Sequence, residues 1–341
     1  MTPGERDQFV GRCVEAGIAA EVDSPLALLT TYGVGGAASV AVTLRSTDEI
    51  MRFAGVTAVF PDVPLVVIGR GSNTLVADTG FDGVAVIMAT GEESRAVQVD
   101  DDGLVTASGS MLMPVLARRS VQAGRGGLEW CVGIPGTVGG AVRMNAGGHG
   151  AEMVDSLTSV SLVSLRSGRR CDVAAAQLGL RFRGSALCPQ HLVVSATFRT
   201  AAIDPSSGEA TINDIVSWRR QNQPGGRNAG SVFVNPSPGD GSAGALIDSL
   251  GLRGYAAGGA HVSDKHANFI QATDGATASD VVAVMSHVQE RVSTELGITL
   301  LSEVRLVGFD DDVVERFGGS RHPGPGAAEA CTELCGLMGD L

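Results

Sequence analysis

Glycine is concentrated between residues 133 and 148, and this concentration limits what the chain can fold into more than any other feature. Six of these sixteen residues are glycine. Inside a regular helix or strand each glycine is unfavourable, because it loses the most conformational freedom on folding. We therefore expect an extended, irregular backbone against which a flat or anionic ligand can lie; the alternative is a loop-rich corner of a barrel. The candidate ligand-binding residues here are Gly133, Ile134, Pro135, Gly136, Thr137, Gly139, Gly140 and Asn145.

A second glycine-rich turn follows the apolar segment 64–68, which we expect to be a buried strand. Successive backbone N–H groups in such a turn can bind a phosphate. The turn lacks the third glycine of a dinucleotide-binding fingerprint, and no Gly-Lys-Ser/Thr follows as in a P-loop. Alone it is more often structural, but two such segments in one half of the chain favour a large cofactor that contains a pyrophosphate. Its residues are Gly69, Arg70, Gly71, Ser72, Asn73 and Thr74.

Apolar periodicity predicts a mixture of helices and strands. A capped helix opens the chain, and a strand–helix–strand unit follows. Short strands broken by glycine come next, then a turn-rich break near residue 203, and then a second region that ends in a strand. The expected strands are 39–44, 64–68, 84–88, 96–100, 104–108, 157–165, 191–199, 231–234, 267–271 and 303–308, and the expected internal helices are 113–123, 211–222 and 277–295. The tail after residue 310 combines a glycine- and proline-rich linker with a short apolar helix.

The charge balance excludes one broad class of function. The formal net charge is −12, so a surface that binds nucleic acid over the whole protein is not expected. No apolar run is long enough to span a bilayer and the N-terminus is polar, so we expect a cytoplasmic protein without membrane contact. Six scattered cysteines suit reduced thiols. Cys331 and Cys335 have helical spacing, but without further ligands we expect no metal site.

Several side chains are candidates for chemistry, although each has a structural alternative. Arg181 and Arg183 flank Phe182 next to a turn, which in an acidic protein suggests a clamp for an anion. Ser231 lies between a glycine and an apolar segment, but no Gly-x-Ser-x-Gly elbow marks it as a hydrolase nucleophile. Glu303 begins an apolar segment, a position at which a single carboxylate is usually solvated.

Taken in order, these motifs resemble one enzyme family. They are TTYGVGG from Thr30, GRGSN from Gly69, GIPGTVGGAVRMNAG from Gly133, GSVF from Gly230, VSDKHANFI from Val262 and EVRLVG from Glu303. This series closely resembles the UDP-N-acetylenolpyruvoylglucosamine reductases, the FAD enzymes of bacterial peptidoglycan synthesis. The resemblance covers about residues 25–308 and leaves out both ends of the chain.

The resemblance implies an α+β fold with a split FAD-binding domain of the vanillyl-alcohol-oxidase type and a C-terminal α+β substrate-binding domain. The expected FAD-binding subdomains are 1–88 and 89–202. The expected substrate-binding domain is 203–309. The tail, 310–341, is expected to be a flexible linker with a short docking helix and is a candidate contact for wall-synthesis proteins.

The resemblance also implies roles for individual residues. The two glycine-rich segments, with Asn145, would hold FAD, and NADPH would reduce it. Arg183 would be the catalytic arginine, Ser231 the proton donor and Glu303 the glutamate that precedes the family's Val-Arg strand. For the substrate, a UDP-sugar, the candidate binding residues are Arg219, Arg220, Asn235 and Lys265.

The stretch from Arg183 to Ser231 contains no tyrosine, which indicates the form of the family that lacks a tyrosine-bearing loop. Phe182, Val234 and His149 depart from the family's usual residues, and these departures affect substrate contacts rather than the reaction. Two alternatives remain open at this point. One is another flavin oxidoreductase of the same superfamily that acts on a sugar lactone or a hydroxy acid. The other is a non-catalytic flavin- or nucleotide-binding module.

Overall fold

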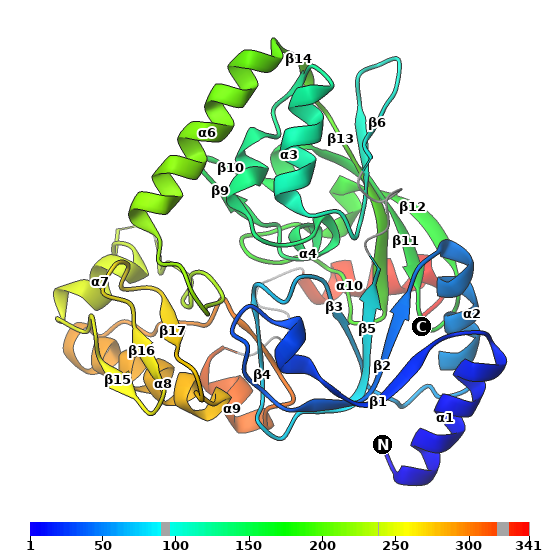
Figure 1. The fold of residues 1–341 in the computed structure, drawn as a ribbon, viewed down its shortest axis with the longest axis horizontal. Helices are drawn as coiled ribbons and strands as arrows, with labels where there is room; N and C mark the ends of the chain where they lie inside the picture. The colour runs from blue at the N-terminus through cyan, green and yellow to red at the C-terminus, as the bar shows by residue number, and fades with distance from the viewer. Residues whose placement is uncertain (90–95, 238, 319–326, 341) are drawn as a thin grey trace.

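The computed structural model describes residues 1–89, 96–237, 239–318 and 327–340, which form three sheet-based units and a C-terminal helix (Figure 1). The first unit is a four-stranded sheet of order β1-β2-β5-β3 with two helices. Strand β1 is antiparallel to β2, whereas β2, β5 and β3 are parallel. Its elements are α1 (Pro3–Glu15), β1 (Ala20–Pro25), η1 (Leu26–Leu29), β2 (Ala37–Leu44), α2 (Thr47–Thr57), β3 (Leu65–Ile68) and β5 (Phe81–Met88).

Local chemistry explains both helix starts in this unit. Thr2 and Glu5 form a capping box, and Pro3 occupies the first turn of α1, where its missing N–H removes no hydrogen bond. Ser46 caps α2 by accepting from the backbone of Glu49. The apolar side of α1 packs on the sheet through Phe9, which is fully buried. These helices agree with the sequence expectation.

The second unit contains a five-stranded antiparallel sheet of order β12-β11-β13-β7-β6. Its strands are β6 (Gln98–Val99), β7 (Val105–Ser108), β11 (Leu157–Ser164), β12 (Arg170–Ala174) and β13 (His191–Phe198). Smaller elements are β8 (Arg125–Gly126), η3 (Glu129–Gly133), β9 (Gly147–Gly148), β10 (Ala151–Glu152), α5 (Met153–Ser156), η4 (Ala175–Leu178) and β14 (Ala201–Ala202). The main helices are α3 (Met113–Gln122), α4 (Val138–Arg143) and α6 (Pro205–Asn222), and α6 packs against α3 and η3.

Two expectations for this region are wrong. The glycine-rich stretch is not irregular throughout, because residues 138–143 form α4. Thr137 caps this helix by accepting from the N–H of Gly140, and the apolar side chains of Val138, Ala141 and Val142 are buried. The expected break near residue 203 is also largely helical, because Asp204 caps α6 and Pro205 fits its first turn.

The third unit combines helices α7 (Ala243–Ser249) and α8 (Ala278–Leu296) with the sheet β15 (Ala256–Ala257), β16 (Ala260–Val262) and β17 (Ile270–Ala272). Strand β18 (Arg305–Val307) leaves this unit and pairs in parallel with β4 (Thr74–Val76), at the end of the glycine-rich turn that follows β3. The expected strand 231–234 is wrong: Phe233 forms a single bridge with Ser302. The pairing of β18 with β4 therefore joins the third unit to the turn that follows β3.

The tail supplies two further helices, α9 (Asp311–Arg316) and α10 (Ala327–Met338). In Figure 1 the red α10 lies among elements of the second unit rather than beside α8. Its Leu334 and Met338 are fully buried in that unit's core. The expected linker between these helices falls mostly on residues 319–326, outside the described residues. The division of the chain into domains at 88, 202 and 309 stays a prediction.

Across the part of the chain that the structure describes, no helix has the length and apolar character that crossing a membrane requires.

Candidate active site

A cavity of about 830 Å³ lies where segments from all three units meet. Its lining comes from the turn after β3, the segment after η3, the loop around Arg183, the end of α6, the Ser231 segment and the start of β18. The structure therefore brings together residues that are far apart in the sequence. The predicted residues that line the cavity are Gly69, Arg70, Gly71, Ser72, Asn73, Thr74, Gly133, Ile134, Pro135, Gly136, Thr137, Gly140, Arg183, Arg219, Ser231 and Glu303.

The two glycine-rich segments touch each other at this cavity. A Cβ atom on Gly69 would lie 2.4 Å from Oγ1 of Thr137, and one on Gly136 would lie 3.3 Å from Oγ of Ser72. Gly71 has a φ of +59°, and a Cβ there would lie 2.1 Å from the carbonyl oxygen of Leu29. A side chain at Gly69 or Gly71 would therefore clash with a neighbouring segment, so these positions require glycine.

The turn also has backbone donors to offer. Among the described residues, the N–H groups of Arg70, Gly71 and Ser72 have no hydrogen-bond acceptor. By contrast, the first N–H groups of α4 are satisfied within the protein, since Val138 donates to Met111 and Gly139 to Gly109. We infer that the turn after β3, rather than the start of α4, is the part of the cavity suited to a phosphate.

Three arginines give the cavity a positive wall. Arg143, Arg181 and Arg305 line it and are half-buried, and none has a carboxylate within ion-pair distance in the described ranges. Burial and, to a smaller extent, the nearby charges of Arg143 and Arg181 together lower the pKa of Arg305 to about 10, so it still carries a charge at neutral pH. Three cations without counterions in one cavity favour an anionic ligand such as a diphosphate.

Arg183 is fixed in position by its neighbours. Its φ of +55° is unusual for a residue with a side chain. Its Nε lies 2.8 Å from Oε1 of Glu303, its Nη1 lies 3.6 Å from Oε1 of Glu152, and its guanidinium stacks on the ring of Phe182. Asn145 in turn donates to Oε2 of Glu152. The guanidinium therefore keeps one orientation at the cavity wall.

Glu303 connects the cofactor turn to the serine segment. Its backbone N–H donates to the carbonyl oxygen of Val232, and its own carbonyl accepts from Nδ2 of Asn73 at 3.0 Å. Burial raises the pKa of the Glu303 carboxyl, and Arg183 opposes that rise. Because Asn73 is in the turn after β3, the carboxyl is held between that turn and Ser231.

Ser231 is positioned by its backbone neighbours. Gly230 before it has a φ of +76°, and the residues after it are fixed by Asn268, whose backbone and side-chain oxygens accept from Val232 and Phe233. Its hydroxyl makes no hydrogen bond to another described residue, although it lines the cavity. The hydroxyl is therefore available to a ligand.

Five predicted residues are not among those that line the cavity. Gly139 packs toward Gly109 and Val193 of the sheet, and Asn145 is buried behind Glu152. Lys265 donates from Nζ to the carbonyl oxygen of Arg220, so these two residues contact each other instead. Asn235 accepts from the N–H of Ala243 at the start of α7. The residues outside the cavity are Gly139, Asn145, Arg220, Asn235 and Lys265.

Sequence reasoning missed two cationic residues and one carboxylate. Arg143 and Arg305 were visible inside the motifs GIPGTVGGAVRMNAG and EVRLVG, but nothing in the spacing showed that their side chains meet. Glu152 had no local signal, because its role depends on Arg183, which is 31 residues further along the chain and adopts a left-handed backbone conformation. Arg181, considered as part of a clamp, does line the cavity.

The adjoining glycine-rich segments and the cationic wall indicate a dinucleotide-binding protein. Residues 38–174 match the family model for an FAD binding domain, and residues 221–307 match the C-terminal domain of UDP-N-acetylenolpyruvoylglucosamine reductase. The reductase of that name from Gloeobacter violaceus is 40% identical over 286 residues, which are 83% of this chain and 94% of the relative. The one from Geobacter metallireducens is 39% identical over 292 residues, which are 84% of this chain and 93% of that relative. The chain therefore belongs to the UDP-N-acetylenolpyruvoylglucosamine reductase family.

A solved structure supports the same assignment. The UDP-N-acetylenolpyruvylglucosamine reductase of Thermus caldophilus superposes with a TM-score of 0.70 at 33% identity, covering 85% of this chain and 98% of that one. The expected fold class, α+β with a split FAD-binding domain of the vanillyl-alcohol-oxidase type, is confirmed. The protein is a flavin-dependent oxidoreductase. Membership of the form without the tyrosine loop stays a prediction.

Proposed function

We propose that this protein reduces UDP-N-acetylglucosamine enolpyruvate to UDP-N-acetylmuramate for peptidoglycan precursor synthesis, with bound FAD and with NADPH as the source of electrons. The observation that carries the proposal is a series of hydrogen bonds and one ion pair that connects the cofactor turn to the candidate catalytic residues. Asn73 of that turn contacts Glu303, Glu303 contacts Arg183, and the backbone of Glu303 contacts the Ser231 segment. A ligand held by the turn therefore lies beside a fixed cation and a free hydroxyl.

The residues present fit FAD. The free N–H groups of Arg70, Gly71 and Ser72 suit its pyrophosphate, and Gly69 and Gly136 leave bare backbone where a Cβ would intrude. When bound, FAD supplies a hydride from N5 to the β carbon of the enolpyruvyl group. The protein's part is to orient the substrate at that position, to exclude water and to stabilise the charge that develops.

The guanidinium of Arg183 would bind the substrate carboxylate. As hydride reaches the β carbon, negative charge spreads onto that carboxylate, and stabilising this charge is the main catalytic requirement. Arg183 meets it with a planar, permanently charged group whose orientation is already fixed by Glu303, Glu152 and Phe182. Little reorganisation is then needed during the reaction.

The Ser231 hydroxyl would deliver a proton to the α carbon. Serine is a weak acid, but a carbanionic centre is a strong base, so position matters more than a shifted pKa. The segment is held by Asn268 on one side and by Glu303 on the other. Both anchors keep the hydroxyl at the cavity wall, which would make protonation specific for one face of the substrate.

For the substrate diphosphate, Arg219 is the predicted cation that lines the cavity, and we propose it for that role. Its Nε donates to Oε1 of Gln223 at 2.8 Å, which orients the guanidinium. Arg220, Asn235 and Lys265 would act indirectly, by holding the end of α6 and the start of α7 in place.

We also propose a cytoplasmic location, where NADPH is available. The tail would act within the chain rather than on wall-synthesis proteins, because the apolar face of α10 is buried.

An anaerobic absorbance titration with the Ser231→Ala variant tests the proposal. NADPH should bleach the flavin of both proteins, and UDP-N-acetylglucosamine enolpyruvate should then restore the oxidised spectrum in the wild type. In the variant this second step should slow by on the order of 100-fold or more, because the proton donor is missing. Ser217→Ala, on the exposed side of α6, is the matched control and should behave as wild type. Equal reoxidation in Ser231→Ala would remove the serine from the mechanism, and no reoxidation in the wild type would overturn the function.

A further inference from the structure

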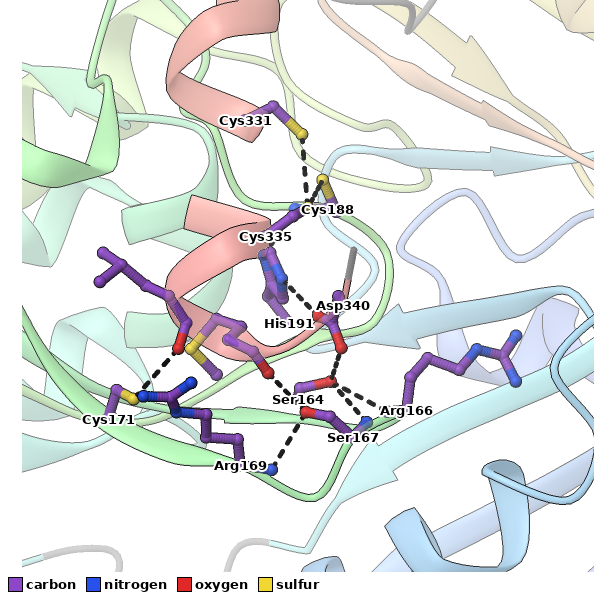
Figure 2. A network of polar contacts seen from close by, with 12 residues as sticks. Ser164, Arg166, Ser167, Arg169, Cys171, Cys188, His191, Cys331, Cys335 and Asp340 are labelled. Carbon is purple, nitrogen blue, oxygen red and sulfur yellow. Dashed lines mark hydrogen bonds and ion pairs between the residues drawn. The ribbon is translucent and has the colours of Figure 1, made fainter. Parts of the chain in front are cut away.

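Three cysteine thiols meet between the second unit and the C-terminal helix (Figure 2). Cys188 precedes β13, and Cys331 and Cys335 lie one turn apart on α10. The Sγ atom of Cys335 lies 3.7 Å from that of Cys188 and 3.9 Å from that of Cys331. All three sulfur atoms lie within 4.8 Å of one another. Cys188 also lines the cavity, but among the described residues no thiol of the cluster forms a hydrogen bond or ion pair with Arg183, Glu303 or Ser231 of the proposed reaction.

These distances fit a metal ion bound by thiolates. With a zinc–sulfur bond of about 2.3 Å, two ligands of a tetrahedral site are about 3.8 Å apart. The measured separations of 3.7 and 3.9 Å match that edge. A disulfide would instead require two of the sulfur atoms to approach to about 2.0 Å, which would leave the third cysteine unpaired.

A cation next to the cluster supplies the charge balance. Arg143 donates from Nη1 to the carbonyl oxygen of Cys188 at 2.9 Å, and no carboxylate pairs with it among the residues that the structure describes. Three thiolates and one divalent ion sum to −1, and Arg143 would lie beside that charge while it also lines the cavity.

The cluster is preorganised because α10 is anchored just beyond it. Oδ2 of Asp340 lies 3.0 Å from Nε2 of His191, and its Oδ1 accepts from the hydroxyl of Ser164. Ser167 donates from Oγ to the carbonyl oxygen of Met338. These contacts set the position and rotation of α10, so Cys331 and Cys335 face Cys188 without further rearrangement. Figure 2 shows this network below the thiols.

We propose that Cys188, Cys331 and Cys335 bind one zinc ion that fastens α10 to the second unit, with water at the fourth position. Each thiol must lose its proton when the metal binds, so affinity should rise with pH. From the sequence we noted the helical spacing of Cys331 and Cys335 but expected no metal site, because the third cysteine is 147 residues from Cys335 in the chain.

Cobalt titration of the full-length, FAD-loaded protein tests this proposal. The protein is first reduced and stripped of metal with a chelator, and it is then titrated anaerobically with Co²⁺. Because the reduced flavin is bleached, the ultraviolet thiolate-to-cobalt absorption can be measured as a difference spectrum. We expect that absorption to saturate at one ion per chain and to disappear when Zn²⁺ is added. Metal analysis after dialysis against Zn²⁺ should likewise give one zinc per chain.

Two variants and one control make the result specific. Cys335→Ser and Cys331→Ser should each weaken Co²⁺ binding by on the order of 100-fold, because each removes one of three direct ligands. Cys331 is half-exposed, so its variant should keep the fold, which retention of FAD checks. Cys171→Ser is the control, since that thiol contacts Leu337 of the same helix but lies outside the cluster. Absence of stoichiometric binding in the wild type, unchanged binding in both variants, or a Cys188–Cys335 disulfide in the freshly isolated protein would overturn the proposal.

Discussion

Arg183 is restrained on three sides, by Glu303, Glu152 and the ring of Phe182. Replacing it by lysine keeps the positive charge but loses the planar fork that can brace two carboxylate oxygens. We expect Arg183→Lys to lower kcat by on the order of 100-fold with little change in FAD content. Steady-state kinetics with the enolpyruvyl substrate measure this effect. Arg119→Lys on the exposed face of α3 is the control, and near-normal turnover of Arg183→Lys would remove Arg183 from the catalytic set.

The carboxyl of Glu303 should impose a pH dependence on the reaction. Burial raises the pKa of Glu303, so its charge is lost at a higher pH than for an exposed glutamate. As pH falls through that raised pKa, the protonated carboxyl no longer braces Arg183, and kcat should fall. Glu303→Gln should lower kcat at neutral pH by about tenfold and remove the acidic limb. The pH–rate profiles of the wild type and the variant test this prediction. An unchanged acidic limb in the variant would show that another group causes the loss of activity in acid.

At the residue scale, the sequence was informative where a motif carried the role. Arg183, Ser231 and Glu303 were predicted from motifs, and the structure places all three on one cavity. Lys265 was chosen because of its charge, but its ammonium is used by the carbonyl oxygen of Arg220. Whether a cationic side chain already binds another group of the protein depends on backbone atoms that are far away in the sequence. Spacing along the chain does not reveal such contacts.

Helix α8 begins at a carboxylate from another unit. Asp78 accepts hydrogen bonds from the N–H groups of Ala278 and Ser279 and from the Ser279 hydroxyl. Burial raises the pKa of Asp78, but the bonds from Ser279 and Ala278 outweigh it and lower the pKa overall. Its contribution to stability is therefore fully present above the pKa of an unfolded aspartate and is lost as pH falls from there through the lowered pKa of the folded protein.

We expect Asp78→Asn to lower the free energy of unfolding by about 1 kcal/mol, because the amide replaces one accepting oxygen by a donor at a helix N-terminus. Urea denaturation at neutral pH measures the change, and the difference from wild type should shrink in acid. Asp62→Asn, in the turn before β3, is a control of the same chemistry. A difference that persists at acidic pH would show that the charge of Asp78 is not what matters.

The two leucines of α10 report on its packing. Leu334 is fully buried, whereas Leu337 is 41% exposed. Leu334→Ala should destabilise the protein by about 2–4 kcal/mol through the cavity it leaves. Leu337→Ala should change stability by less than about 0.5 kcal/mol. Thermal unfolding of both variants makes the comparison, and equal losses would contradict the docked position of α10.

Long elements with strong periodicity or caps were predictable, and short ones were not. Helix α8 and strands β11 and β13 match the expected ranges closely. Helix α4 was missed because two of its six residues are glycine and local propensity argued against it. Its stability comes instead from Thr137 and from packing on the sheet. Strand β1 was missed because half of its residues are polar, most of them are exposed, and the strand lies at the sheet edge.

For the whole molecule, ligand binding should couple all three units. The cavity takes residues from each unit, so FAD should stabilise them together. FAD at 100 times its dissociation constant should add about 2.7 kcal/mol to the free energy of unfolding. Scanning calorimetry of the FAD-free protein should show one unfolding transition, and its midpoint temperature should rise when FAD is added. Riboflavin, which lacks the pyrophosphate, is the control ligand; an equal shift with riboflavin would show that the turn at Gly69–Thr74 does not bind phosphate.

The parallel pairing of β18 with β4 has a consequence for biosynthesis. Arg305 lies opposite Thr74 in this pair, so one wall of the cavity joins residues that are translated far apart in time. A nascent chain that has not yet reached β18 lacks that wall and cannot hold the flavin tightly. Cofactor loading should therefore follow synthesis of β18, and chains that terminate before it would accumulate as colourless species that cellular proteases can remove.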